Sequence, residues 1–218
     1  FPVNFYSITV ILKDGPPIIA VAAYSPAIKI FNYLLSKDVN IKTPNTPKGL
    51  SYKPIIYYAL GGRSREIIQA LLDKNVDMTY SLEATIRFGY SQLTNDIYNA
   101  LEKQMPGSPP SEIFKNGIIT AENPLRLAIQ SKDIETAVFV IDKYRKEFGE
   151  QYKSYLVFRN KNALHIAAKT DSKEMLGIFQ EEEIDFLINK ENSKGQCPLE
   201  YSLKGTMYQS PHFLLEII

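Results

Sequence analysis

Residues 162–176 read Asn162-Ala163-Leu164-His165-Ile166-Ala167-Ala168-Lys169-Thr170-Asp171-Ser172-Lys173-Glu174-Met175-Leu176. The first part is a short apolar segment that ends in two alanines, and such small residues let helix backbones approach closely. A polar corner follows, and after it comes a second amphipathic segment. This order of segments predicts a hairpin of two short helices joined by a turn.

Segments of the same kind recur along the chain. With Ala168 as the reference position, the corresponding residues are Ala23, Leu60, Ile86, Ile129 and Leu203. Successive reference positions are 26 to 43 residues apart, and a separation of this size is typical of a repeat protein with variable loops. The widest gap contains Met105-Pro106-Gly107-Ser108-Pro109-Pro110, which we interpret as an inserted surface loop.

These segments resemble the ankyrin repeat, whose signature runs Thr-Pro-Leu-His-x-Ala-Ala, then a Gly-His turn, then Glu-Ile-Val-x-Leu-Leu. The resemblance covers about residues 17–218 and is strongest at residues 163–168 with Glu174. It implies an all-α fold, an ankyrin-repeat solenoid of about six helix-turn-helix units with irregular loops. The whole chain, residues 1–218, would then be a single array. Its units are expected near residues 16–40, 53–78, 80–103, 122–148, 161–188 and 196–218, with the inserted loop near 104–117.

The chain departs from the ankyrin pattern at its capping positions. Only His165 fills the histidine position of the signature, and glycine fills the turn only at Gly89. The hydrogen bonds that the family makes with threonine and histidine must therefore come from other residues or be absent.

Composition argues against several classes of function. Lysine and arginine total 25 against 24 aspartate and glutamate, a net charge of +1, so a nucleic-acid partner is not expected. No apolar run reaches the roughly 20 residues that span a bilayer, so membrane insertion is not expected. The single cysteine, Cys197, fits a reducing compartment, and both chain ends look cut. The abundance of isoleucine and lysine resembles ankyrin proteins that intracellular pathogens deliver as effectors, so a cytoplasmic location, in the host if secreted, is expected.

Three motifs could suggest chemistry, and each has a structural interpretation that we favour. His165 and Cys197 could form a nucleophilic pair, but they occupy positions that are structural in the repeat. Gly61-Gly62-Arg63-Ser64 lacks the phosphate-loop pattern and fits a corner between two helices. Glu181, Glu182 and Glu183 fit a solvated charge cluster. We therefore predict no catalytic residue, no metal, no cofactor and no small-molecule substrate.

The resemblance implies that another protein binds in the concave groove, at the corners and loop tips. The aromatic residues Tyr33, Phe139 and Phe179 are expected in the core. The predicted partner-binding residues are Tyr24, Tyr52, Arg63, Arg87, Phe88, Tyr90, Gln130, Lys132, Asn160, Lys161, Lys169, Asp171 and Lys194. An alternative is that the array targets substrates to a catalytic domain outside this sequence.

Overall fold

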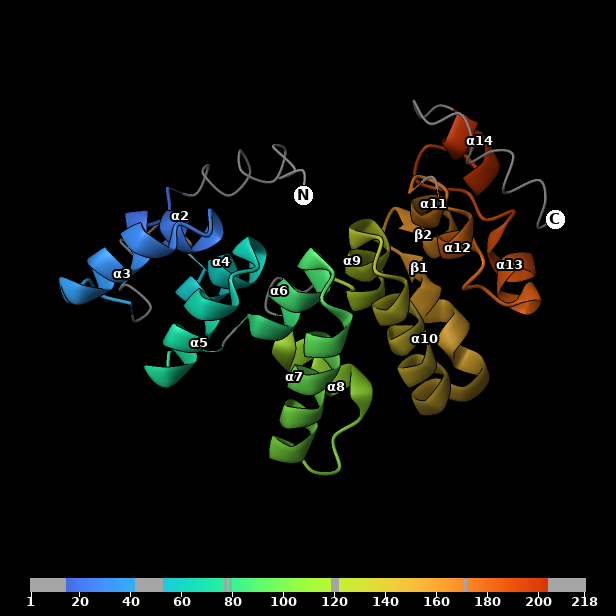
Figure 1. Cartoon of the computed structure of the whole chain (residues 1–218). Coiled ribbons are helices and arrows are strands. Elements are labelled where there is room, and N and C mark those ends of the chain that lie inside the picture. The colour runs from blue at the N-terminus through green and yellow to red at the C-terminus, as the bar shows by residue number, and fades with distance from the viewer. Residues whose placement is uncertain are drawn as a thin grey trace. The chain divides into compact units, whose positions relative to one another are not determined.

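The computed structural model describes residues 15–41, 53–76, 78, 80–118, 122–170 and 172–203. The chain divides into two compact units, residues 1–84 and residues 85–218. Almost every described element is a helix, and consecutive helices form hairpins (Figure 1). The predicted all-α fold of helix pairs is therefore confirmed within each unit.

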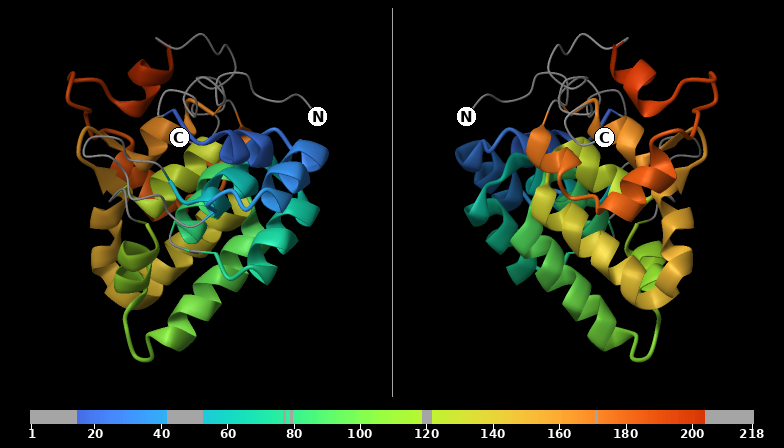
Figure 2. Two further views of the ribbon diagram at one scale, coloured as in Figure 1. Left: turned by 90° about the vertical axis from the view of Figure 1, so that its left-hand side faces the viewer. Right: turned by 90° about the vertical axis from the view of Figure 1, so that its right-hand side faces the viewer.

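The described residues of the first unit form two helix pairs. The first pair is α2 (Ile18–Tyr24) with α3 (Ile28–Ser36), and the second is α4 (Ile55–Gly62) with α5 (Arg65–Asp73). α2 packs against α4 and α3 packs against α5, so the two pairs stack first helix on first helix and second on second (Figures 1 and 2). This stacking is what the predicted repeat requires.

Close packing of the first helices depends on small residues. Ala20 and Ala23 of α2 and Ala59 of α4 are buried. A Cβ atom on Gly62 would lie 2.2 Å from the carbonyl oxygen of Ala23 and 2.6 Å from that of Tyr24. The glycine pair at residues 61–62 is therefore a corner where two backbones meet, as expected from the sequence.

The second helices of the first unit are less buried than their spacing predicted. Phe31 is the buried residue of α3, whereas the Tyr33 side chain is 62% exposed and lies under the Lys37 ammonium group. The prediction that Tyr33 belongs to the core was wrong, because α3 turns Phe31 inward. Phe179, by contrast, is buried as predicted, and Phe139 is half-buried.

The second unit continues the same pattern. α6 (Ser81–Phe88) begins in the first unit and ends in the second, where it leads into α7 (Ser91–Gln104). α9 (Pro124–Ser131) pairs with α10 (Ile134–Phe148). A short 3₁₀ helix, η1 (Gly149–Leu156), leads into a small antiparallel ribbon of β1 (Val157–Phe158) and β2 (Lys161–Asn162).

The last helices follow this ribbon. α11 (Ala163–Ala167) is succeeded by α12 (Lys173–Leu176), α13 (Glu181–Leu187) and α14 (Pro198–Leu203). α11 packs against both α9 and α14, so first helices again stack on first helices (Figure 1). The organisation of all 218 residues as one array of six units stays a prediction.

The segment expected as an inserted loop near residues 104–117 contains a helix, α8 (Pro110–Gly117). Proline at its first turn suits a helix start, and the Ser111 backbone N–H and hydroxyl donate to the Glu147 carboxylate of α10 at 2.7 and 2.5 Å. Ile113 and Phe114 are buried, and Phe114 packs against the Tyr98 ring at 5.0 Å between centres. The loop interpretation was wrong for residues 110–117. The prolines and glycine just before them indicated a loop, whereas the residues that follow form a short amphipathic helix.

We predict that Gly62→Ala lowers the free energy of unfolding by about 3 kcal/mol, because the added methyl group overlaps two backbone carbonyl groups. Urea denaturation followed by circular dichroism measures this. Gly177→Ala is the control, since its Cβ meets no atom closer than 3.4 Å and its φ is −70°. That substitution should be neutral or slightly stabilising. Equal losses in both variants would contradict the close approach at Gly62.

Candidate functional site

The corners between paired helices expose the residues that close each first helix. Arg63 ends α4 with φ 61° and Lys132 ends α9 with φ 60°, and both side chains are exposed. The first helices themselves are buried: all five residues of α11 lie in the core. Each corner therefore carries side chains that the core does not use.

The second helices begin directly after these corners with side-chain caps. The Ser64 hydroxyl accepts from the Ile67 N–H, an Asp133 carboxylate oxygen from the Thr136 N–H, and the Ser172 hydroxyl from the Met175 N–H. Such caps fix where the second helix starts. They hold each exposed corner in a defined backbone conformation.

The predicted partner-binding residues differ in exposure. Tyr52 and Asp171 lie outside the described residues. The exposed ones are Arg63, Gln130, Lys132, Asn160, Lys169 and Lys194. The half-buried ones are Tyr24, Arg87, Phe88, Tyr90 and Lys161.

Arg87 is partly committed to the structure of its own unit. Its Nη2 lies 3.4 Å from Glu122 Oε1, and the two side chains are 31% and 35% exposed. An ion pair at such exposure contributes at most about 1 kcal/mol. The ion pair with Glu122 therefore contributes little to stability.

Four predicted residues come together near the end of the described chain. The Asn160 carbonyl accepts from the Ser193 N–H at 3.2 Å, which joins the turn of the β-ribbon to the turn that carries Lys194. Lys161, from β2, donates a hydrogen bond to the hydroxyl of Tyr201 on α14. The Lys169 ammonium group lies 4.5 Å from the centre of the same ring.

Tyr201 connects these lysines, and sequence reasoning missed it as a site residue. It occupies the position in the sixth unit that corresponds to Ile166 in the fifth. The second unit also carries a tyrosine at this position, Tyr58, so the residue type alone gave no signal that set Tyr201 apart. Two ammonium groups lie close to one phenol.

His165 uses both of its ring nitrogens for backbone contacts. Nδ1 accepts from the Asn162 N–H at 3.2 Å, and Nε2 lies 2.9 Å from the Gln196 carbonyl oxygen, to which it donates. Asn162 Oδ1 accepts from the His165 N–H at 3.0 Å, which completes a capping box at the start of α11. With neither nitrogen available to accept a proton from Cys197, this arrangement supports the structural interpretation of the histidine.

Residues other than threonine and histidine also cap the first helices of the two neighbouring units. In the sixth unit the Glu200 carboxylate accepts from the Cys197 N–H at 3.0 Å, where the fifth unit uses the imidazole. In the fourth unit Asn123 Oδ1 accepts from the Arg126 N–H at 3.1 Å. The capping that the signature supplies with threonine and histidine thus comes, in these units, from asparagine and glutamate.

The acidic run at residues 181–183 is divided between solvent and core. Glu181 and Glu182 are exposed, whereas Glu183 is fully buried. The Glu183 carboxylate accepts from Arg145 Nη2 at 2.7 Å and from the Tyr152 hydroxyl at 2.8 Å. Burial, and then the hydrogen bond to Glu183, raise the pKa of Tyr152, so the hydroxyl keeps the proton that it donates.

The solvated-cluster interpretation was therefore wrong for Glu183. This carboxylate ties α13 to α10 and η1, and a buried charge of this kind requires its partners.

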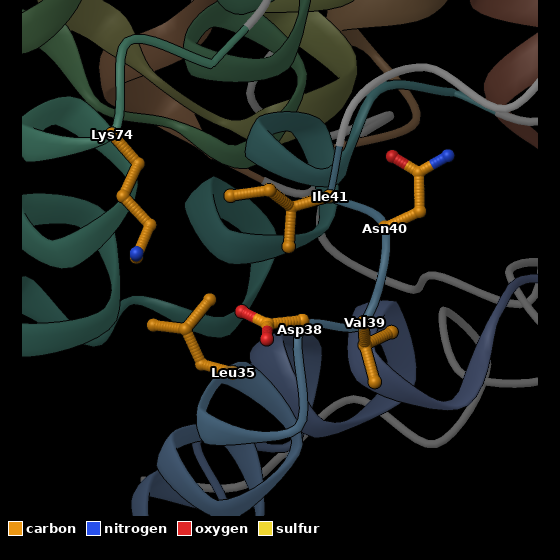
Figure 3. Close-up of a pocket in the computed structure, with 6 residues that line it drawn as sticks. All are labelled: Leu35, Asp38, Val39, Asn40, Ile41 and Lys74. Atoms are coloured by element: carbon orange, nitrogen blue, oxygen red, sulfur yellow. The ribbon is translucent and has the colours of Figure 1, made fainter.

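A small pocket lies in the first unit, between the ends of α3 and α5 (Figure 3). Its volume is about 200 Å³ and it is open to solvent. Ligand sites for small molecules usually enclose about 300–1,000 Å³. The lining residues are Leu35, Asp38, Val39, Asn40, Ile41 and Lys74, none of which was predicted to bind a partner.

Among the residues that the structure describes, no group of three or more His, Cys, Asp and Glu side chains is arranged to hold a metal ion. Within the same residues, no helix combines the length and the apolar character needed to cross a membrane.

We predict that the free energy of unfolding falls as the pH drops below about 6.5, the usual histidine pKa. Burial, together with the charge of Lys161, lowers the pKa of His165 in spite of the hydrogen bond to Gln196. The unfolded chain then binds a proton that the folded chain does not, and this stabilises the unfolded state. Denaturation at a series of pH values from about 7.5 to 5 measures the effect.

His165→Gln should remove this part of the pH dependence. The control is the same substitution at the chain's other histidine, His212, which should leave it in place. A dependence abolished by His212→Gln and kept by His165→Gln would contradict the assignment.

Neither a protein-family model nor a curated protein matches the chain. Among solved structures, the chain is similar to the ankyrin repeat domain of human ASB11, at 14% sequence identity and a TM-score of 0.43. The match covers 93% of this chain and 98% of that one. The helix pairs described above agree with the all-α fold of helix-turn-helix units that the sequence predicted.

Proposed function

We propose that this chain is a protein-interaction module that binds a partner protein at the corners of its helix pairs. The observation that carries the proposal is the contrast between buried first helices and exposed corner residues. In α9, five of eight residues are buried, while Gln130 and Lys132 at its end are exposed. Side chains placed this way can contact another molecule without loss of core packing.

Repetition of the corner strengthens this argument. α9 and α11 pack side by side within the second unit, and each ends in an exposed basic residue, Lys132 and Lys169. A stack of hairpins presents the same position of every hairpin on one surface, and each position can vary independently. The chemistry of the described corners fits recognition better than catalysis, since the histidine of the chain's best-matching repeat is committed to backbone hydrogen bonds.

The half-buried aromatic residues at the corners would supply apolar contact area. Phe88 and Tyr90 flank the turn between α6 and α7, and Tyr24 ends α2. Partly buried aromatic side chains are held in place by their own unit, so a partner loses little conformational entropy when it packs on them. The charged corner residues would orient the partner protein, and the aromatic corner residues would supply apolar contacts that strengthen its binding.

The test is affinity capture from lysate with the tagged chain and two variants of equal charge. The corner variant carries Arg63→Glu and Lys132→Glu, one substitution in each unit. The helix variant carries Lys29→Glu and Lys146→Glu, on exposed positions of α3 and α10. A partner that the parent and the helix variant retain, and that the corner variant loses at unchanged helicity and melting temperature, is the expected result.

A partner that the corner variant retains and the helix variant loses would contradict the proposal. It would place the binding surface on the second helices.

A further inference from the structure

Two positive charges converge on one phenol at the last described hairpins. Lys161 Nζ donates to the Tyr201 hydroxyl and lies 4.4 Å from the ring centre, and Lys169 Nζ lies 4.5 Å from the same centre. We call Lys161, Lys169 and Tyr201 the lysine–tyrosine site. The ring itself rests on a buried imidazole, with 5.5 Å between the centres of Tyr201 and His165 in an edge-to-face contact.

No carboxylate of the described residues forms an ion pair with either lysine. Glu200, next to Tyr201 in sequence, directs its carboxylate to the Cys197 backbone N–H. Burial lowers the pKa of His165, so the imidazole in contact with the ring favours its neutral form and supplies no counter-charge to the lysines. The two ammonium charges at this site are thus not neutralised within the part of the chain that the structure describes.

The pKa of the Tyr201 hydroxyl reflects the positive charge around it. Burial by itself raises the pKa of Tyr201, but the hydrogen bonds and charges of Lys161 and Lys169 outweigh it and lower that pKa below its ordinary value. A site that favours the anionic form of its own tyrosine also favours an anion brought to it. The same ammonium groups are held in place by the ring before any ligand arrives, which reduces the entropy lost on binding.

The Tyr201 hydroxyl and the two lysine ammonium groups have hydrogens left to donate to such an anion. Lys161 donates to the Tyr201 oxygen, so the hydroxyl hydrogen remains to be donated elsewhere, and no acceptor for it occurs among the described residues. Each ammonium group carries three hydrogens. A carboxylate, with two acceptor oxygens, matches a hydroxyl and a lysine donor that lie this close together.

We propose that the lysine–tyrosine site binds an aspartate or glutamate side chain in an acidic segment of a partner protein. This inference rests on the proposed function and gives the chemistry of the partner at one corner. Asn160 precedes Lys161 in the chain, and its carbonyl group accepts from the N–H of Ser193, the neighbour of Lys194. Lys194, exposed there, would attract a second acidic residue of the same segment.

A protein partner is favoured over a nucleic acid by the surroundings. Two exposed carboxylates lie close to the site in sequence: Glu200 precedes Tyr201, and Glu191 lies in the same segment as Lys194. A nucleic-acid strand presents a row of phosphates and needs several basic contacts in succession. One or two acidic side chains need only this isolated positive site, and they avoid the carboxylates around it.

The test is an NMR titration of the full labelled chain with a capped five-residue peptide that contains two glutamates. The matched peptide carries glutamine at both positions. Saturable shifts of the Tyr201 ring and Lys169 signals with the glutamate peptide, and none with the glutamine peptide, are expected. Lys169→Gln and Tyr201→Phe should each weaken binding by about twofold to fivefold, the size of a partly exposed charged contact.

Lys146→Gln removes one charge from an exposed position on α10 and should bind as the parent does. Equal binding of the two peptides, or equal weakening in Lys169→Gln and Lys146→Gln, would overturn the proposal. So would a ten-residue oligothymidine that shifts the same signals when the glutamate peptide does not.

The result separates this inference from the proposed function. If the peptide does not bind but the corner variant Arg63→Glu with Lys132→Glu loses its partner, only the lysine–tyrosine site is wrong. If the peptide binds at Tyr201 but the corner variant keeps its partner, the site stands and the wider corner surface is wrong.

Discussion

The close approach of neighbouring first helices is the constraint on which the rest of the structure depends. In the first unit Gly62 of α4 lies against the Ala23 carbonyl group of α2, with no room for a Cβ atom. In the second unit α9 and α11 pack together, and Ala128, Ala163 and Ala167 are fully buried. Helices that approach this closely leave no space for long side chains between them, so the long polar side chains lie at the corners.

The hydrogen bonds that hold each hairpin are the most variable part of the fold. In the fifth unit the His165 imidazole accepts a hydrogen bond from the Asn162 N–H, and Asn162 in turn accepts from the His165 N–H. In the sixth unit the Glu200 carboxylate takes the place of the imidazole and accepts from the Cys197 N–H. Each solution satisfies a backbone N–H at the start of a helix, which is the physical requirement. Sequence divergence at these positions is therefore compatible with the same backbone, and it explains why the signature is strongest in one unit, at residues 163–168 with Glu174.

Sequence reasoning worked where the information is local. The alanine pattern and the polar corners place the helices of residues 162–176, because helix periodicity and small residues act over a few positions. It failed where distant residues decide. Arg145 and Glu183 are 38 positions apart, so neither the burial of Glu183 nor its pairing could be predicted from the acidic run. Lys161 meets Tyr201 across 40 positions, and the site that they form with Lys169 was missed for the same reason.

For the corner residues too, local features were predicted correctly and features that depend on distant residues were not. The resemblance to the ankyrin repeat singled out Arg63, Gln130, Lys132 and Lys169 as corner residues, and all four are exposed. The aromatic residues at the corners, Tyr24, Phe88 and Tyr90, are half-buried, because how far an aromatic ring turns inward depends on the neighbouring helix. Helix α8 was hidden in a run of breakers, and what fixes its start is Glu147, on another helix.

The central claim is that the corner residues belong to a surface that the core does not need. The most direct measurement is the free energy of unfolding of one variant that carries Arg63→Asn, Gln130→Ala, Lys132→Asn and Lys169→Gln. Asparagine is chosen at the two corners with positive φ because it tolerates that conformation. The account predicts a value within about 1 kcal/mol of the parent. A loss of about 3 kcal/mol or more would mean that these side chains hold the fold together, and it would contradict the account.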